Sequence, residues 1–280
     1  MTDDQWSDLG YNDVTELGGG WQSRTFVVRA GDTRLVAKLT RADLVDKHAL
    51  ERKTALVADL ARIEPSVVAP ARIGGTFVHE SEQWLITATS FVDGEHVDQA
   101  DPSSGTVLGT ALAGLHRSMC QLPTAQVPRV ATLTTDAAGR WTSTSSDQLL
   151  HGDFAASNVV VSPEGIRVFD FDDCGYGPIE FDIANSLYMV MFDTWVQERA
   201  NSGYQLFREE FLASYAETAE GQVSVSDIDD LIRVRVMALD QWVHDPSEAP
   251  IGIRNSSPDW IATLHRFVDE WDRWNDSLDP

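Results

Sequence analysis

The chain has 280 residues, of which 42% are hydrophobic and 23% charged, as is ordinary for a folded globular protein. Its 44 acidic and 21 basic residues give a net charge of −23. Such a charge repels a phosphate backbone, which argues against nucleic acid as a partner, whereas it concentrates a cationic substrate. Solubility or adaptation to salt would explain the same charge, so its cause stays open.

Neither a membrane segment nor a leader is predicted. No stretch approaches the roughly 18 consecutive apolar residues of a membrane span, and the acidic start of the chain is unlike a signal peptide. The two cysteines, Cys120 and Cys174, form no CxxC motif or Cys/His cluster, so neither a disulfide framework nor a zinc site is predicted. We therefore expect a cytoplasmic protein without a membrane partner, either a monomer or a homodimer.

The first hundred residues predict mainly strands. A turn signal at residues 30–33 separates β-rich runs at 25–29 and 34–38 and predicts a hairpin. The next segments predict, in chain order, a helix over 43–62 and extended structure over 67–78 and 84–92. The dipeptide Asp93-Gly94 then breaks the pattern. We place an N-terminal lobe over residues 1–92 and a second lobe over 93–280.

Helices dominate the second part of the chain. Apolar spacing predicts them over 104–118, 180–196, 203–219, 226–243 and 258–275. Residues 119–147 are rich in Pro, Thr, Ser and Ala and are predicted to be irregular. An aromatic stripe on the last helix indicates core packing rather than a ligand cage. The stripe consists of Trp260, Leu264, Phe267, Trp271 and Trp274.

A β-rich island over residues 148–171 holds a group of polar side chains. Asp153 and Asn158 lie five positions apart, just before the run at 159–161, and Asp170 ends the next apolar run. If the two runs pair as a hairpin, Asn158 and Asp170 lie at the same end of it, with Asp153 nearby. Amide and carboxylate oxygens are suitable ligands for Mg²⁺, which usually takes one or two carboxylates plus substrate phosphates.

These motifs resemble the aminoglycoside phosphotransferase and choline kinase family, distant relatives of the protein kinases. The matching segments follow in family order over about residues 17–190. They are the turn at 19–23, the L-x-x-L-H helix end at 112–116, the H-G-D-x-x-x-x-N loop at 151–158, the strand end at 169–171 and the D-I-A at 182–184. The resemblance implies an α+β, protein-kinase-like two-lobed fold, with a small β-rich N-terminal lobe and a larger, mostly helical C-terminal lobe.

The resemblance also implies an activity and roles in the second lobe. A phosphotransferase of this family uses Mg²⁺ and ATP, or GTP, to phosphorylate a hydroxyl of a small molecule. Asp153 would accept or orient the proton of that hydroxyl, and Asn158 and Asp170 would bind magnesium. His151 and Asp182 would support the loop structurally, His151 by packing and Asp182 by accepting backbone hydrogen bonds.

Nucleotide contacts are implied for the first lobe. Lys38 matches the lysine that reaches the nucleotide phosphates, and Glu51 on the next helix is its expected partner. The glycine-rich turn would cover the phosphates because glycine permits close backbone approach. The backbone of the lobe-connecting segment would contact adenine. The positions implied in these two segments are Gly19, Gly20, Ser23, Ser90 and Val92.

The acceptor is the open part of the prediction. An aminoglycoside-like or other cationic antibiotic is expected from the acidic charge and the resemblance, and resistance would follow from its phosphorylation. Candidate acidic contacts are Asp172, Asp173, Asp193 and Asp240; the first two fit a solvated loop equally well. The alternatives are a metabolite kinase for choline, homoserine or methylthioribose, and a regulatory protein that binds nucleotide without catalysis.

Overall fold

A computed structural model describes most of the chain and divides it into two compact units. The described residues are 3–17, 23–123, 126–134, 147–219, 223–247, 249, 253 and 256–276. Unit 1 comprises residues 1–93 with 124–127, and unit 2 comprises residues 94–123 with 128–280. Within the described ranges, none of the helices combines the length and apolar character that a membrane span needs.

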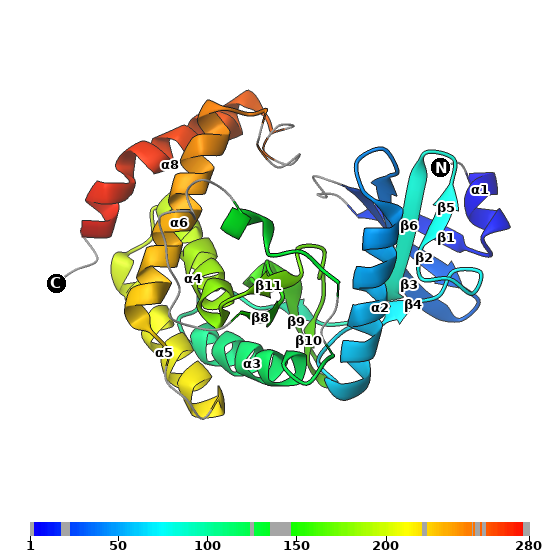
Figure 1. Ribbon diagram of the computed structural model, residues 1–280, viewed down its shortest axis with the longest axis horizontal. Coiled ribbons are helices and arrows are strands. Elements are labelled where there is room, and N and C mark those ends of the chain that lie inside the picture. Colours follow the sequence, from blue (N-terminus) through cyan, green and yellow to red (C-terminus); the bar gives the residue numbers. More distant parts are fainter. Residues whose placement is uncertain are drawn as a thin grey trace. The chain divides into compact units, whose positions relative to one another are not determined.

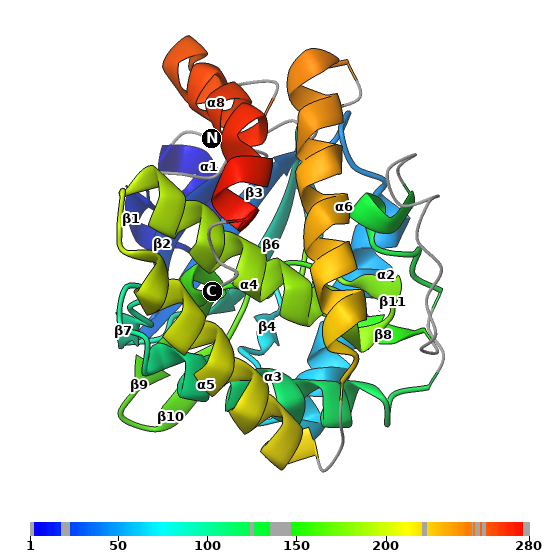
Figure 2. The same cartoon turned by 90° about the vertical axis from the view of Figure 1, so that its left-hand side faces the viewer.

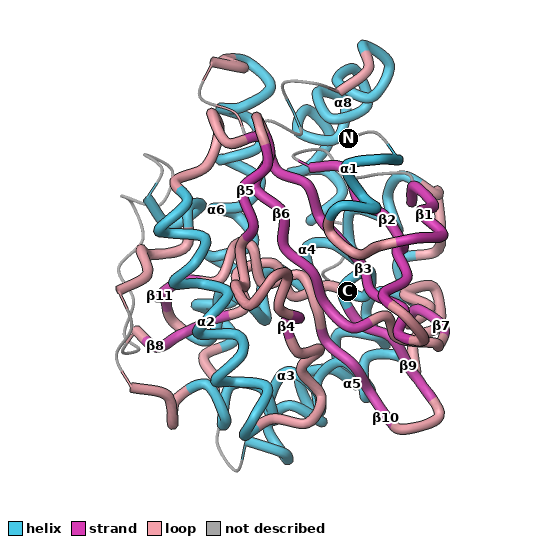
Figure 3. The backbone as a smooth tube through the Cα atoms, turned by 90° about the vertical axis from the view of Figure 1, so that its right-hand side faces the viewer, coloured by secondary structure: helices cyan, strands magenta, loops and turns pink. Residues whose placement is uncertain are grey.

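Unit 1 is built on an antiparallel sheet, whose strands run side by side in Figure 3. The strand order is β1-β2-β3-β6-β4, and β5 pairs with β6. The strands are β1 (Asn12–Leu17), β2 (Ser23–Ala30), β3 (Thr33–Arg41), β4 (Pro70–Ala71), β5 (His79–Ser81) and β6 (Trp84–Ser90). The predicted hairpin is confirmed, because β2 and β3 pair along their length around Gly31, whose φ of 59° suits the turn.

The alternation along β3 separates the core of unit 1 from a second face. Leu35, Ala37 and Leu39 are buried in one apolar cluster together with Trp6 and Phe26. Side chains at the intervening positions lie on the opposite face of the sheet because successive side chains of a strand alternate. Helix α1 (Asp3–Asp8) supplies Trp6 to this core, and neither α1 nor β1 is predicted from the sequence.

Helix α2 (Lys47–Ile63) follows the sheet's third strand (Figure 1). Its N-cap is Asp46, whose carboxylate accepts a hydrogen bond from Ala49 N at 2.6 Å. The helix therefore starts four residues later than the predicted residue 43. The extended structure predicted over residues 67–78 is reduced to β4 and an isolated bridge, since Gly74 and Gly75 adopt positive φ and form a turn there.

Unit 2 is mostly helical, and its predicted helices are confirmed within one or two residues at each end. They are α3 (Ser104–Met119), α4 (Ile179–Val196), α5 (Asn201–Ala219), α6 (Val225–His244) and α8 (Pro258–Asp276). Helix α3 packs against α5, α4 against α6, and α6 against α8 (Figure 2). Figure 2 also shows α4 among these helices.

Close packing of α3 on α5 depends on two glycines one turn apart. A Cβ at Gly105 would lie 2.4 Å from Phe207 O, and a Cβ at Gly109 would lie 2.3 Å from Phe211 O. Real Cβ atoms do not approach backbone oxygen so closely, so only glycine permits this spacing of the two helices. The aromatic stripe of α8 packs as predicted, with Phe267 fully buried against Phe192 of α4.

Three short strand pairs carry the loops of unit 2. Strand β9 (Val159–Ser162) pairs with β10 (Gly165–Val168) and with β7 (Glu95–His96), while β8 (Gln148–Leu150) pairs with β11 (Gly175–Gly177). In the described part of the segment expected to be irregular, a short 3-10 turn forms at Ala131–Thr134. Residues 124–125 and 135–146 of that segment lie outside the described residues.

Candidate active site

The predicted hairpin forms and brings two candidate metal ligands to one end of a strand pair. Val159 pairs with Val168, so the residues before β9 and after β10 meet at the same end. The N–H of Phe169 donates to Asn158 O at 3.1 Å and extends the ladder by one step. Asn158 and Asp170 are therefore neighbours in space, as the pattern of apolar runs indicates.

A buried carboxylate fixes the loop at residues 151–154. Asp182 is fully buried in the first turns of α4, and its two oxygens accept from His151 N at 2.8 Å and Gly152 N at 2.9 Å. An acidic side chain near a helix N-terminus is also favoured by the helix dipole. Gly152 has a φ of 85°, and a Cβ there would lie 2.1 Å from Asp173 O. Glycine is thus required at that loop position.

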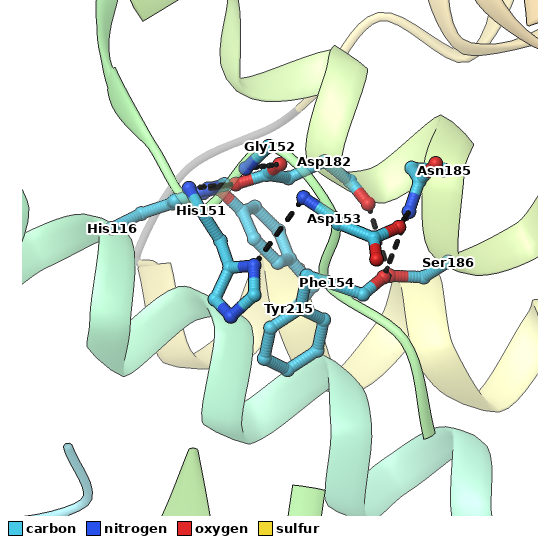
Figure 4. Close-up of polar contacts among 9 residues, drawn as sticks. All are labelled: His116, His151, Gly152, Asp153, Phe154, Asp182, Asn185, Ser186 and Tyr215. Atoms are coloured by element: carbon cyan, nitrogen blue, oxygen red, sulfur yellow. Dashed lines mark hydrogen bonds and ion pairs between the residues drawn. The ribbon is translucent and has the colours of Figure 1, made fainter. Parts of the chain in front are cut away.

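His116 and Tyr215 extend the hydrogen-bond network of the Asp182 carboxylate. His116 Nε2 is 3.1 Å from Asp182 Oδ2, and His116 Nδ1 is 2.8 Å from the hydroxyl of Tyr215 (Figure 4). All three side chains are buried. Burial raises the pKa of Tyr215, and the carboxylates of Asp182 and Glu180 raise it further, so its neutral hydroxyl is the hydrogen-bonding form. The network links α3, α4 and α5 to the loop.

Both ring nitrogens of His151 make polar contacts, and two phenylalanine rings pack against its imidazole. Nε2 lies 3.1 Å from Phe169 O, and Nδ1 accepts a hydrogen bond of 3.3 Å from Asp153 N. The ring also packs against Phe154 and Phe171, with centroid distances of 5.7 and 4.4 Å. These contacts suit the packing and hydrogen-bonding role expected for this residue.

Two amide side chains hold the carboxylate of Asp153. Asn158 Nδ2 lies 3.3 Å from Asp153 Oδ2 and donates to Asp153 O at 2.8 Å. On the other side, Asn185 Nδ2 donates to Asp153 Oδ1 at 3.2 Å (Figure 4). Asp153 is only partly buried, so its carboxylate is fixed in orientation and still open to a reacting group.

The donor set at the hairpin end fits a hard divalent cation. Because the Nδ2 group of Asn158 faces Asp153, its Oδ1 is the atom available to a metal, and Asp170 supplies a carboxylate. Asp170 adopts a φ of 64°, an uncommon conformation that non-glycine residues keep where their surroundings require it. Within the described residues, no group of three or more His, Cys, Asp or Glu side chains is placed to hold a metal ion.

Unit 1 places Lys38 in the middle of its sheet. Lys38 lies on β3 opposite Thr25 of β2 and Thr87 of β6, on the face away from the apolar cluster. Glu51 of α2 contacts His48 at 3.1 Å and Lys47 at 4.0 Å on its own helix. The pairing of Glu51 with Lys38 stays a prediction.

The other nucleotide-contact positions are partly described. Gly19 and Gly20 lie outside the described residues, and Ser23 is buried at the start of β2. At the end of β6, Ser90 N donates to Ala69 O at 3.3 Å, and Val92 follows two residues later. Their contacts with adenine stay predictions.

The four candidate acceptor contacts lie in different surroundings. Asp172 and Asp173 are exposed on the loop after Phe171, and a Cβ added at Gly152 would lie 2.1 Å from the carbonyl oxygen of Asp173. Asp193 pairs with Arg199 at the end of α4, and Asp240 lies 3.0 Å from His244 on α6. Asp173 thus lies beside the loop of residues 151–154, and Asp172 precedes it in the chain.

Sequence reasoning misses two residues of this site. Asn185 and Tyr215 contact Asp153 and His116, which lie 32 and 99 positions away. The only available signal for Asn185 is its position three residues after Asp182, since residues at i and i+3 share a helix face. Tyr215 has no such signal, because it reads as an ordinary core aromatic of α5.

Comparisons with known proteins agree with this architecture. The model of the phosphotransferase enzyme family matches residues 13–141 and 120–221, whereas no curated protein sequence matches the chain. An amicoumacin kinase in complex with AMP-PNP, Ca²⁺ and Ami is similar with a TM-score of 0.75 at 19% identity, over 95% of this chain and 91% of that one. A microcompartment-associated aminopropanol kinase gives 0.69 at 16% identity, over 98% and 97%.

A spectinomycin phosphotransferase in complex with ADP and spectinomycin is also similar, with a TM-score of 0.62 at 12% identity, over 95% of this chain and 94% of that one. The expected α+β, protein-kinase-like fold is confirmed by these likenesses. The family match covers well over half of the chain. The chain therefore belongs to the phosphotransferase enzyme family and is a small-molecule kinase.

Proposed function

We propose that this kinase transfers the γ-phosphoryl group of ATP or GTP to a hydroxyl of a small cationic molecule, with an aminoglycoside-like or other cationic antibiotic as the leading class. The observation that carries the proposal is the held carboxylate of Asp153 beside Asn158 and Asp170. Phosphoryl transfer asks a protein mainly for positioning and charge neutralisation. The fixed carboxylate of Asp153 supports the first, and a cation held by Asn158 and Asp170 would supply the second.

Asp153 is the proposed catalytic residue. Its carboxylate accepts the proton of the attacking hydroxyl as the oxygen–phosphorus bond forms and the bond to the leaving nucleoside diphosphate breaks. Positioned proton transfer of this kind contributes about 10²–10⁴ in rate. The hydrogen bonds that fix residues 151 and 152 to Asp182 keep the carboxylate in place between turnovers.

Asn158 and Asp170 are the proposed ligands of Mg²⁺. A Mg²⁺ ion held there would supply positive charge against the phosphate groups of the nucleotide. Lys38 is the proposed contact of the nucleotide phosphates in unit 1, with Glu51 as its partner, and Gly19, Gly20, Ser23, Ser90 and Val92 form the remaining nucleotide contacts.

A cationic acceptor is supported by charge. The chain carries −23 net charges, and exposed acids at 172 and 173 lie next to the catalytic loop. The kinase for aminopropanol among the similar structures acts on a molecule with one amine and one hydroxyl. That likeness favours a small amino alcohol as the second candidate acceptor, in which case the chain is a metabolite kinase.

Release of nucleoside diphosphate tests the proposal directly. Purified protein is mixed with Mg²⁺, ATP or GTP and one acceptor at a time from aminoglycosides, cationic peptide antibiotics, aminopropanol, choline, homoserine and methylthioribose. We expect turnover with one cationic class and its loss in Asp153→Asn. Turnover only with homoserine, a zwitterion, or with methylthioribose, which carries no charge, would contradict the cationic class. Nucleotide binding without turnover on any acceptor would favour a non-catalytic binder.

A further inference from the structure

A fully buried amide on α4 contacts the proposed catalytic carboxylate. Asn185 has no exposed surface, and its Nδ2 lies 3.2 Å from Asp153 Oδ1 and 3.3 Å from Phe154 O. One amide hydrogen is thus available for each acceptor. Its Oδ1 is buried without a hydrogen-bond partner. Figure 4 shows the nitrogen turned toward Asp153 and the oxygen turned away.

The orientation of this amide follows from its neighbours. The two atoms facing Nδ2 are a carboxylate oxygen and a carbonyl oxygen, and both can only accept hydrogen bonds from it. Exchanging the oxygen and nitrogen of Asn185 would set oxygen against oxygen at both contacts. The side chain of residue 185 therefore acts as a donor toward Asp153.

Stability alone does not account for asparagine at this position. A buried carbonyl oxygen without a partner costs its full desolvation energy, whereas an apolar side chain with the same branching would not. The unpaired oxygen of Asn185 therefore costs folding free energy, and the hydrogen bonds that its Nδ2 donates offset this cost. Its neighbour Ser186 already bonds Phe154 O at 2.8 Å, so the contact that Asn185 does not share with Ser186 is the one with Asp153 Oδ1.

We propose that Asn185 is a positioning residue that fixes the Asp153 carboxylate for proton acceptance; this inference rests on the proposed function. Asn158 in the loop donates a hydrogen bond to Asp153 Oδ2, and Asn185 on α4 donates one to Asp153 Oδ1. Both oxygens of the carboxylate are therefore hydrogen-bonded. Rotation about the side-chain bonds of Asp153 would break one of the two contacts. Misplacement of a reacting group by about 1 Å can cost about 10² in rate.

The test compares two adjacent positions on α4. Asn185→Leu and the smaller Asn185→Ala remove the contact with Asp153 as well as the buried oxygen, whereas Ser186→Ala removes only a bond to the Phe154 carbonyl and leaves Asn185 in place. We measure kcat, KM for nucleotide and acceptor, and Tm. For at least one Asn185 variant we expect kcat to fall about tenfold or more, with KM within about threefold and Tm unchanged or higher.

Ser186→Ala should show the opposite pattern, with a lower Tm and a smaller loss of kcat than either Asn185 variant. Asn185→Leu should also cause no further loss in an Asp153→Asn background, because a positioning residue acts only through the group it positions. Wild-type kcat in both Asn185 variants, or a loss of kcat that persists without the Asp153 carboxylate, would overturn the inference. Wild-type turnover that falls about 10²–10⁴-fold in Asp153→Asn, and so stays measurable in that background, shows separately that the proposed function holds.

Discussion

Substitution of Asp182 by asparagine should lower the free energy of unfolding substantially. In the chain, Oδ1 accepts from Gly152 N, and Oδ2 accepts from His151 N and faces His116 Nε2. The amide of the variant could keep its oxygen toward the latter two donors, but its NH₂ group would then oppose the N–H of Gly152. One hydrogen bond to a charged group is lost, about 1.5–3 kcal/mol, and a buried N–H is left unpaired, about 1–3 kcal/mol. We expect a loss of about 3–5 kcal/mol, a large share of the ~5–15 kcal/mol typical of proteins.

Urea unfolding of the Asp182→Asn variant measures this loss, with kcat as a second readout. The control is Asp193→Asn, the same substitution on the same helix, where a partly exposed acid pairs with Arg199. That pair should contribute about 0–1 kcal/mol. A cost below about 1 kcal/mol for Asp182→Asn, close to that of the control, would refute the idea that the buried carboxylate anchors the loop through its backbone hydrogen bonds.

Three further outcomes are expected. Gly109→Ala should lower the free energy of unfolding by about 1–3 kcal/mol, because its Cβ would lie 2.3 Å from Phe211 O. Gly114→Ala on the same helix meets open space and should raise the free energy of unfolding by about 0.5–1 kcal/mol. Equal effects of the two substitutions in urea titrations would contradict this. Folding raises the pKa of Tyr215 above its usual 10.0, so stability should fall as pH rises above 10, and Tyr215→Phe should make that fall shallower in alkaline unfolding curves. Chelation of Mg²⁺ should abolish turnover, and Asp170→Asn should raise the Mg²⁺ concentration needed to restore it; an unchanged requirement would remove Asp170 from the metal site.

The elements that the sequence predicts best are those whose pattern repeats over many residues. Helices predicted over 180–196 and 226–243 are found as Ile179–Val196 and Val225–His244, because several turns of apolar spacing outweigh errors at any one position. The hairpin at residues 159–168 is also found, since its two short apolar runs flank a Pro-Glu-Gly turn signal. Strand β1 is missed, because it is an edge strand with little buried surface and shows no apolar alternation.

In the candidate site, too, local features can be predicted from the sequence and long-range contacts cannot. Asp153, Asn158 and Asp170 can be selected from the sequence because they lie close along the chain, within one loop and one hairpin. The contacts that hold these three residues cannot be predicted from the sequence, since those contacts depend on how helices distant in sequence pack. His116 reaches Asp182 across 66 positions only after α3 and α4 have folded into one unit.

The first turns of α4 explain how a single helix can hold the four residues of the loop at 151–154. Asp182, Asn185 and Ser186 lie at i, i+3 and i+4 and therefore on one face. Along the loop they contact, in order, the N–H groups of residues 151 and 152, the side chain of 153 and the carbonyl of 154. A helix is stiffer than a loop, so the loop takes its geometry from the helix. The helix face therefore keeps the carboxylate of Asp153 in place.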